Sequence, residues 1–339
     1  MSYQPPYTIT PTILNLLAEI SESIGRMSVL TEETDQLRLR RINRIRTIQG
    51  SLAIEGNTLS EDQITAILEG KPVIAPAREV QEARNAILAY EQFGQWQPHR
   101  KSDLLKAHQV LMMGLVDDAG RYRSSGVGVM KGDKVVHMAP PAERVNLLVK
   151  NLLSWLKNSK EHALISSCVF HYEFEFIHPF SDGNGRMGRL WQTLILSQWK
   201  PLFENIPVES MVYANQEGYY KSIRESTQNS DSAPFIEFML SRILEACNVD
   251  SKNATPQDTP QVTPQVNQMI SVMNELDDEI NREQLQRALK LRDRKSFRSR
   301  YLQPALELGL IEMTLPDKPT SSLQKYRLTA LGKKYLAGP

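Results

Sequence analysis

Cysteine is scarce in this sequence, and its scarcity excludes two kinds of site. Two of the 339 residues are cysteines, Cys168 and Cys247, and they lie far apart along the chain. Two cysteines are too few for a disulfide framework or for a zinc site built from thiolates. Each lies within an apolar pattern of helical period, so we expect both side chains in the core.

Long hydrophobic runs and an excess of charge are missing as well. The sequence has no run of about 18 apolar residues, the length that a membrane-spanning helix needs, and its start lacks the basic and apolar regions of a signal peptide. With 40 basic and 39 acidic residues the net charge is +1, too little to draw the whole protein to nucleic acid or anionic lipid. We therefore expect a soluble, cytoplasmic protein with no membrane partner.

What is present is the composition of a globular protein with two domains. Hydrophobic residues make up 41% of the chain and charged residues 23%, both close to globular averages. The clearest boundary is at residues 248–265, where the triplet Thr-Pro-Gln occurs at 255, 259 and 263. Closely spaced prolines favour an extended and semi-rigid chain. We predict a linker over 248–265 that separates a large first unit from a small second one.

The first unit is predicted to be mainly helical. Ser60 and Gln63 have the spacing of a capping box, and Gly70 closes the helix that they open. The exception is 126–137, where two short β-branched runs flank Lys-Gly-Asp, as in a β-hairpin. Apolar residues with helical spacing also occur in stripes at 13–20 and 42–52 and in the segments 80–93, 104–113, 145–156, 163–177 and 190–199.

The second unit resembles a winged helix-turn-helix in its pattern. Helices are predicted at 266–276, 281–289 and 294–302, and Pro304 interrupts the third helical pattern. Strands are predicted at 310–314 and 325–328. We expect the unit to span residues 266–337.

A local basic stripe lies on this second unit and leaves two interpretations open. A third helix carrying such charge, for example at Arg294 and Arg298, would contact DNA phosphates. The same charge is equally typical of a solvated helix face in a domain used for dimerisation or for docking a protein partner. The stripe has one acid, Asp293, among seven basic residues: Arg287, Lys290, Arg292, Arg294, Lys295, Arg298 and Arg300.

The segment from His178 to Arg189 carries the chemistry. It connects two apolar helices, so it is a loop that enters a helix N-terminus. Gly183 and Gly185 let the backbone approach a ligand closely, and the helix dipole there favours an anion such as phosphate. Arg186 and Arg189 are three residues apart, so both side chains can point from one helical face toward a polyphosphate.

Two further residues of this loop supply the reactive groups. Asp182 offers the oxygen ligands that Mg²⁺ prefers, and a metal there would neutralise phosphate charge. His178, with an ordinary pKa near 6.5, suits a general base for a hydroxyl nucleophile. A zinc site from His171 and His178 is excluded, because seven helical residues separate the two side chains by about 10 Å.

This segment is similar to the Fic motif, His-x-Phe-x-(Asp/Glu)-Gly-Asn-Gly-Arg-x-x-Arg, at every specified position. The resemblance implies a helical Fic core that transfers AMP from ATP to a Ser, Thr or Tyr hydroxyl of a protein and releases pyrophosphate. It implies that His178 is the base, that Phe180 anchors the loop and that Asp182 binds Mg²⁺. The remaining roles follow in the same way: Gly183, Asn184 and Gly185 hold the α-phosphate, and Arg186 and Arg189 contact the β- and γ-phosphates.

Two upstream features extend the resemblance. The hairpin, with Val129, Val135, Val136 and His137, resembles the flap that aligns a target segment by strand pairing. Residues 51–57 resemble the inhibitory signature (Ser/Thr)-x-x-x-Glu-(Gly/Asn) through Ser51 and Glu55, followed by Gly56, which can end a helix in the left-handed conformation. Glu55 would then pair with Arg189 and block its contact with the γ-phosphate.

The resemblance also divides the first unit and suggests a base-binding pair. It covers roughly residues 41–242 and implies an N-terminal helical region over 1–95, with an inhibitory helix at about 41–56, and a catalytic core over 96–247. Tyr219 and Tyr220 resemble the aromatic pair that lines the adenine pocket of many Fic proteins, although such a pair is otherwise simply part of a core.

The expectation is therefore an autoinhibited adenylyltransferase that needs Mg²⁺ and ATP and also modifies itself. Its partners would be ATP and unidentified target proteins, and a second copy of the chain is a further candidate. A first alternative is that the protein removes AMP, with Glu55 orienting a water. A second is a DNA-binding regulator whose Fic core senses nucleotide.

Overall fold

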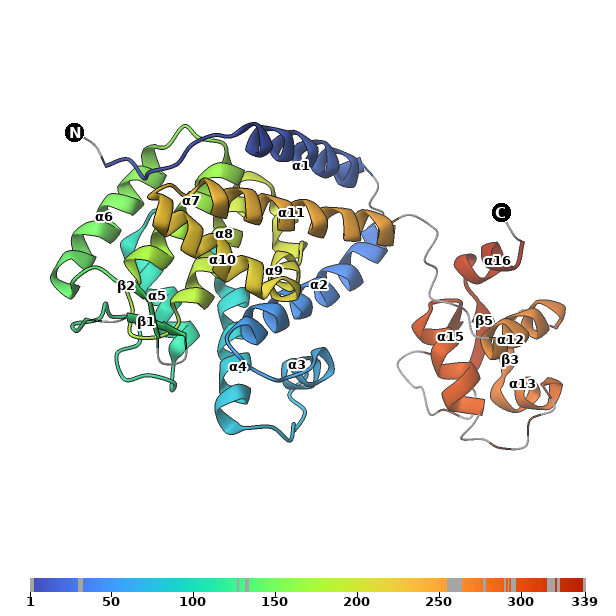
Figure 1. Cartoon of the computed structure of the whole chain (residues 1–339). Coiled ribbons are helices and arrows are strands. Elements are labelled where there is room, and N and C mark those ends of the chain that lie inside the picture. Colours follow the sequence, from blue (N-terminus) through green and yellow to red (C-terminus); the bar gives the residue numbers. More distant parts are fainter. Residues whose placement is uncertain are drawn as a thin grey trace. The chain divides into compact units, whose positions relative to one another are not determined.

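The computed structural model describes most of the chain. The described residues are 3–29, 33–126, 128–131, 134–254, 264–276, 279–289, 291, 293, 297–315, 321 and 324–337. The chain forms two compact units, Met1–Ala254 and Thr255–Pro339 (Figure 1). Among the described residues, none of the helices combines the length and apolarity that crossing a bilayer requires.

Helices build the first unit, as the apolar spacing predicts (Figure 1). A two-stranded antiparallel sheet pairs β1 (Gly128–Lys131) with β2 (Lys134–Met138), where the sequence predicts the hairpin. Short 3₁₀ turns, η1 (Phe93–Gln95) and η2 (Pro201–Asn205), follow two of the helices. The helices are α1 (Pro11–Val29), α2 (Glu33–Ile54), α3 (Glu61–Leu68), α4 (Ala77–Gln92), α5 (Lys101–Met112), α6 (Ala142–Asn158), α7 (Ala163–Ile177), α8 (Asn184–Trp199), α9 (Val208–Ala214), α10 (Gln216–Asn229) and α11 (Ala233–Ala254).

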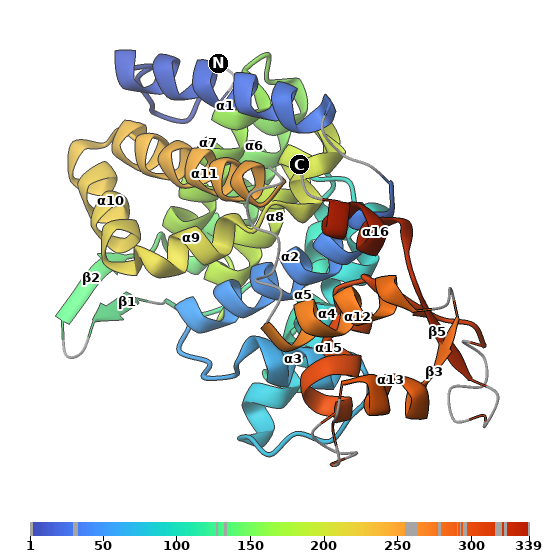
Figure 2. The ribbon, with the colours of Figure 1, turned by 90° about the vertical axis from the view of Figure 1, so that its right-hand side faces the viewer.

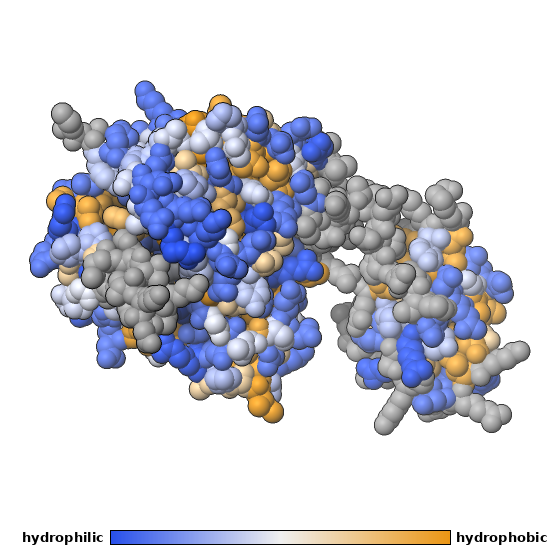
Figure 3. Space-filling model, in the orientation of Figure 1, coloured by the Kyte–Doolittle hydropathy of each residue, from blue (hydrophilic) through white to orange (hydrophobic). Residues whose placement is uncertain are grey.

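Helices α7 and α8 form the centre of this unit. The sequence of α7 is apolar on all sides, which is typical of a helix buried on every face, and most of its residues are buried. Cys168 on α7 and Cys247 on α11 are buried free thiols, as predicted. Burial raises the pKa of Cys168 to about 12, so this thiol stays protonated and unreactive. The face of the molecule in Figure 3 is mostly hydrophilic, with scattered apolar residues.

Helix α2 places the predicted inhibitory residues. It runs beside α9 in both views (Figure 1 and Figure 2), and Gly50 makes this possible, because an added Cβ would lie 2.7 Å from the Ser210 backbone nitrogen. The helix begins at Glu33, upstream of the expected start near residue 41, and ends at Ile54. Gly56 follows with φ +91°, the left-handed ending that the sequence predicts.

The boundary of the predicted linker differs in the structure. Helix α11 continues through Ala254, so residues 248–254 are helical rather than extended. The reason is that these residues contain no proline, and the first residue that disfavours helix is Thr255, which precedes Pro256. Residues 255–263 lie outside the described residues.

The second unit has its own core and combines helices with a small sheet. Strands β3 (Ile280–Asn281), β5 (Lys325–Leu328) and β4 (Ile311–Met313) are antiparallel and lie in that order. The helical elements are α12 (Pro264–Glu275), α13 (Arg282–Ala288), the π-helical turn η3 (Arg298–Leu302), α15 (Gln303–Glu307) and α16 (Ala330–Ala337). They pack around Val266, Met269, Ile270, Met273, Leu285, Phe297, Leu302, Ile311 and Tyr326. The sequence does not predict β3 or α16.

The third helix of this unit continues past Pro304, contrary to the expectation that the proline interrupts it. Pro304 lies in the first turn of α15, a position that tolerates proline, and the wider turn η3 precedes it directly. Of the basic stripe, Arg287, Arg298 and Arg300 are described, while Lys290, Arg292, Arg294 and Lys295 lie outside the described residues. Binding of DNA or of a protein by this unit stays a prediction.

Candidate active site

His178 lies at the end of α7 in an uncommon backbone conformation. It caps the helix with φ 49° and ψ 63°, and its N–H donates to the Phe174 carbonyl at 2.9 Å. A non-glycine residue in the left-handed region needs support from its surroundings. The buried Arg123 gives this support, because its Nε donates to the His178 carbonyl at 2.7 Å and its Nη2 to the Ile177 carbonyl at 3.3 Å. Nothing in the sequence around Arg123 signals this role.

Phe180 fixes the next part of the loop, as predicted. Its ring is fully buried and stacks on the His108 ring, with centroids 3.6 Å apart and planes 3° from parallel. His108 Nδ1 accepts from the Gly120 N–H at 2.8 Å, so Nε2 carries the proton and donates to the Asp182 carbonyl at 3.0 Å. Burial lowers the pKa of His108 to about 4, so it is neutral at pH 7. Sequence reasoning missed this residue.

The Gly-Asn-Gly segment turns the chain into α8. The Asn184 side chain is used within the loop, since its Nδ2 donates to the Phe180 carbonyl and its Oδ1 accepts from the Phe180 N–H, both at 2.9 Å. Gly183 has φ +81°, and a Cβ there would lie 2.5 Å from the Met112 sulfur. The backbone of residues 183–185, rather than the Asn184 amide, is therefore what this turn offers an anion.

Glu55 reaches this turn from α2. Its Oε1 lies 2.7 Å from Arg189 Nη2, and a Cβ added to Gly185 would overlap the Glu55 carboxylate. Arg189 also donates to the Ser51 hydroxyl at 3.2 Å and to the Ser51 carbonyl at 2.9 Å. Burial lowers the pKa of Arg189, but the neighbouring acidic groups, with Glu55 the largest contributor among them, together hold the pKa above its usual value. Arg189 is thus a buried, charged side chain that already has an acidic partner.

Arg186 pairs with carboxylates other than that of Glu55, the partner of Arg189. It is 5% exposed, with Nη1 3.5 Å from Glu82 Oε1 and Nη2 3.3 Å from Asp182 Oδ1. The exposed Arg78 contacts the same two acids, at 3.4 Å from Glu82 and 3.2 Å from Asp182. Each of these two arginines therefore spans both carboxylates. The sequence does not predict Arg78 or Glu82.

Asp182 has the chemistry of a magnesium ligand. Its side chain is 43% exposed, and Oδ1 accepts from the Gly183 N–H at 2.6 Å. Within the described part of the chain, no three His, Cys, Asp or Glu side chains gather as a metal cluster. Mg²⁺ is commonly held by one or two carboxylates together with substrate phosphates and water. Asp182 beside the turn of residues 183–185 fits that arrangement, with nucleotide phosphates as the remaining ligands.

The two tyrosines have different surroundings. Tyr219 is 2% exposed, and its hydroxyl lies 3.0 Å from Nε2 of His171, whose Nδ1 lies 2.7 Å from Gln192 Oε1. Burial lowers the pKa of His171 to about 3, so Tyr219 belongs to a neutral, hydrogen-bonded core. Tyr220 is 37% exposed and donates to the Ile54 carbonyl at 3.5 Å, beside the end of α2. Tyr220 is therefore the more accessible of the pair.

For the predicted flap residues of the hairpin, the structure describes the backbone. Val129 lies on β1, and Val135, Val136 and His137 lie on β2. Val129 pairs with His137, and the register shifts between Val129 and Met130. Their side chains lie outside the described part of the structure.

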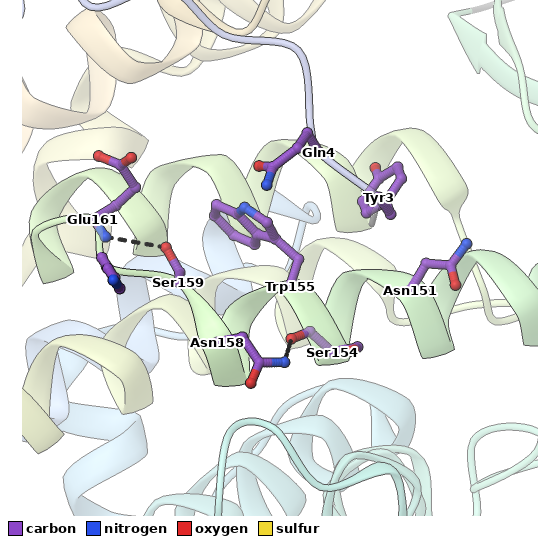
Figure 4. A pocket seen from close by; sticks show the side chains of 9 residues that line it. Tyr3, Gln4, Asn151, Ser154, Trp155, Asn158, Ser159 and Glu161 are labelled. Atoms are coloured by element: carbon purple, nitrogen blue, oxygen red, sulfur yellow. Dashed lines mark hydrogen bonds between the residues drawn. The ribbon is translucent and has the colours of Figure 1, made fainter. Parts of the chain in front are cut away.

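A hollow of about 550 Å³ lies beside the end of α6 (Figure 4). The N-terminal segment and the end of α6 line it, and no residue of the segment 178–189 contributes. Its lining residues are Tyr3, Gln4, Asn151, Ser154, Trp155, Asn158, Ser159, Lys160 and Glu161.

Two carboxyl groups near Arg189 predict that stability falls as the pH rises from about 4.5 to about 8. Burial raises the pKa of Glu175 to about 8 and that of Glu209 to about 7, both from 4.5. The folded protein therefore keeps protons that the unfolded chain has lost, and each group removes about 1.4 kcal/mol per pH unit in that window. His108 and His171 have lowered pKa values, so they make stability rise with pH, but only below about pH 6.5.

The measurement is the free energy of unfolding of the wild type and of Glu175→Gln at pH 6.5 and pH 8. We expect the wild type to lose stability over this interval and the variant to lose clearly less, because it has no proton to release. Equal losses in both proteins would contradict the assignment of a raised pKa to Glu175.

Comparison with known proteins places this site in a family. The Fic/DOC family matches residues 98–196, and the family described as "Filamentation induced by cAMP protein Fic-like, C-terminal domain" matches residues 264–329. A Fic family protein from Desulfovibrio desulfuricans G20, known from its crystal structure, is 53% identical in sequence to this chain. The match covers 97% of this chain and 99% of the Desulfovibrio chain, with a TM-score of 0.74. The chain belongs to the Fic family.

More distant relatives agree with the fold. Residues 134–508 of Fic-1 from C. elegans are 23% identical, with a TM-score of 0.61 over 72% of this chain and 73% of that chain. A curated relative from Nematostella vectensis, named protein adenylyltransferase Fic, is 29% identical over 205 residues, which is 57% of this chain and 45% of that protein. The chain spans about half the length of the curated relatives it matches.

Proposed function

We propose that this protein is an adenylyltransferase that moves AMP from ATP to Ser, Thr or Tyr hydroxyls of target proteins and of itself. The observation that carries the proposal is the loop of His178, which joins a half-buried histidine, an anion-binding turn and two arginines at the start of α8. Family membership supports it, since curated relatives are named protein adenylyltransferases.

In the proposed reaction His178 removes the proton from the target hydroxyl. The hydroxyl oxygen attacks the α-phosphorus of ATP, the bond from that phosphorus to the oxygen of the β-phosphate breaks, and pyrophosphate leaves. The bond formed joins the target oxygen to AMP. The contacts of Arg123 with the carbonyls of Ile177 and His178 hold the backbone of the histidine in place.

Charge at the start of α8 would hold the triphosphate. The backbone turn of residues 183–185 and the helix dipole would stabilise the α-phosphate, where negative charge must be accommodated during the attack, although the Gly183 N–H donates to Asp182 Oδ1 in this structure. Arg186 and Arg189 would contact the β- and γ-phosphates. Mg²⁺ held by Asp182 would neutralise charge on the phosphates and on the leaving pyrophosphate. Tyr220, exposed near the end of α2, is the accessible residue of the proposed adenine-binding pair.

The strands β1 and β2 would align the target. An extended target segment can add to an exposed hairpin edge by main-chain hydrogen bonds, which orient a hydroxyl independently of most side chains. Such recognition is tolerant of sequence, which fits modification of several proteins and of the enzyme itself.

We further propose that Glu55 inhibits the enzyme. Its carboxylate pairs with Arg189 at 2.7 Å and lies against Gly185, so it takes the arginine and the space that the phosphates need. Ser51 reinforces the contact by accepting two hydrogen bonds from the same guanidinium. ATP bound without Arg189 would have its α-phosphorus out of line with the target hydroxyl.

The group transferred is tested with ATP labelled at one phosphate. The protein with Glu55→Gly, incubated with ATP and Mg²⁺, should retain label from the α-phosphate and none from the γ-phosphate, because AMP is added and pyrophosphate leaves. Retention of γ-label would show phosphate transfer instead and would overturn the proposal.

A further inference from the structure

Arg186, like Arg189, has a carboxylate partner from outside the motif. That partner is Glu82 on α4, whose Oε1 lies 3.5 Å from Arg186 Nη1, with both side chains largely buried. Each arginine proposed to contact phosphate is therefore partly neutralised by an acid from another helix: Arg189 by Glu55 and Arg186 by Glu82.

The other oxygen of Glu82 is bound to the turn that carries Glu55. Asn57, two residues after Glu55 and 7% exposed, donates from Nδ2 to Glu82 Oε2 at 2.9 Å. The same amide nitrogen lies 3.2 Å from the Glu79 carbonyl on α4. The chain of contacts thus runs from the turn through Asn57 and Glu82 to Arg186.

We propose that Glu82 is a second inhibitory carboxylate, which holds Arg186 as Glu55 holds Arg189 and which Asn57 couples to the same turn. The inference rests on the proposed function, because it assumes that Arg186 contacts nucleotide phosphate. A carboxylate within 3.5 Å of the guanidinium both neutralises the charge that attracts phosphate and repels phosphate itself. Glu82 is a positioning residue, since it acts on the nucleotide through Arg186.

The turn of residues 55–57 acts on the nucleotide site in two ways. Glu55 contacts Arg189 directly, and Asn57 contacts Arg186 through Glu82. If the turn moves away, Glu55 leaves Arg189, and Glu82 loses the Asn57 hydrogen bond that helps to hold its carboxylate beside Arg186. Arg78 is already 3.4 Å from Glu82 and can keep its carboxylate paired when Arg186 turns to phosphate. A single displacement of the turn would therefore free Arg189 and loosen the hold of Glu82 on Arg186.

The test is the dissociation constant for ATP with Mg²⁺, measured by calorimetry on the full chain. All proteins carry His178→Ala so that ATP is not consumed, and they differ by Glu55→Gly, Glu82→Gln, or both. Glutamine keeps the shape of Glu82 and still accepts from Asn57, but it removes the charge. We expect Glu82→Gln to tighten ATP binding about tenfold, the effect of one charge-assisted contact, and to tighten it further in the Glu55→Gly background.

Glu79→Gln is the matched control. Glu79 lies on the same helix one turn earlier, and its carboxylate accepts from the N–H and the hydroxyl of Thr58 at 2.6 Å and 2.8 Å. The control loosens the same turn without changing the charge beside Arg186. We expect it to change ATP affinity less than about twofold, well below one charge-assisted contact.

The outcomes separate this inference from the proposed function. Unchanged or weaker ATP binding by Glu82→Gln would overturn the inference, and so would an equal gain from Glu79→Gln, because the effect would then come from the turn and not from the charge. If Glu55→Gly does not tighten binding while Glu82→Gln does, Glu55 does not compete with phosphate for Arg189, and the inference about Glu82 stands.

Discussion

Glu55→Gly is expected to raise the rate of self-modification about a hundredfold. The substitution removes the carboxylate that pairs with Arg189 at 2.7 Å and that lies against Gly185. Arg189 is 2% exposed and Glu55 is 36% exposed, so the lower part of the range for losing one partner of a buried charge pair applies, about 3 kcal/mol, which corresponds to roughly that factor. The measurement is the initial rate of label transfer from α-labelled ATP at saturating Mg²⁺.

Glu69→Gly provides a closely matched control. Like Glu55, Glu69 ends a helix immediately before a glycine with positive φ, and it pairs with an arginine, Arg41, at 2.6 Å. It differs in having no contact with the loop of His178 among the described interactions. We expect no increase in rate, and a comparable increase would mean that Glu55→Gly acts by loosening helix ends in general.

His178→Ala in the Glu55→Gly background is expected to lower that rate by about 10²- to 10⁴-fold, the usual contribution of a positioned general base. The target hydroxyl would have to lose its proton to water, while the phosphate site remains intact. ATP binding should therefore persist, and the loss should fall on kcat rather than on KM. A variant that keeps its rate would remove His178 from the mechanism.

His162→Ala controls for damage to the helix. His162 lies at the opposite end of α7, where its Nδ1 accepts from the Leu164 N–H at 3.2 Å as an N-cap. Its loss should cost about 1 kcal/mol of stability, as for other caps, and leave the rate of transfer nearly unchanged. Equal loss of activity in both histidine variants would point to unfolding of α7.

The parts of the fold that the sequence predicts correctly depend on neighbours along the chain. The capping box forms as expected, with the Gln63 N–H 3.2 Å from the Ser60 hydroxyl, and Gly56 ends α2 in the left-handed conformation. Phe180 is buried as expected. The capping box and the helix ending are determined by residues three or four positions apart, so their spacing is sufficient to identify them, whereas the burial of Phe180 is implied by the motif.

The parts that the sequence does not predict depend on contacts between distant segments. Arg123 supports His178 from 55 positions away, and Glu82 reaches Arg186 from another helix. An isolated arginine or glutamate has the same appearance in the sequence whether it is exposed or buried against a site. Helix α11 continues through Ala254 because polar residues without proline do not by themselves end a helix.

The most direct test of the account is the intact mass of three proteins after incubation with ATP and Mg²⁺: the wild type, Glu55→Gly, and Glu55→Gly with His178→Ala. The account predicts that Glu55→Gly gains the mass of one or more AMP groups, that the wild type gains far less, and that the double variant gains none. No gain in Glu55→Gly, or an equal gain in the double variant, would contradict an AMP transferase that depends on His178 and is inhibited by Glu55.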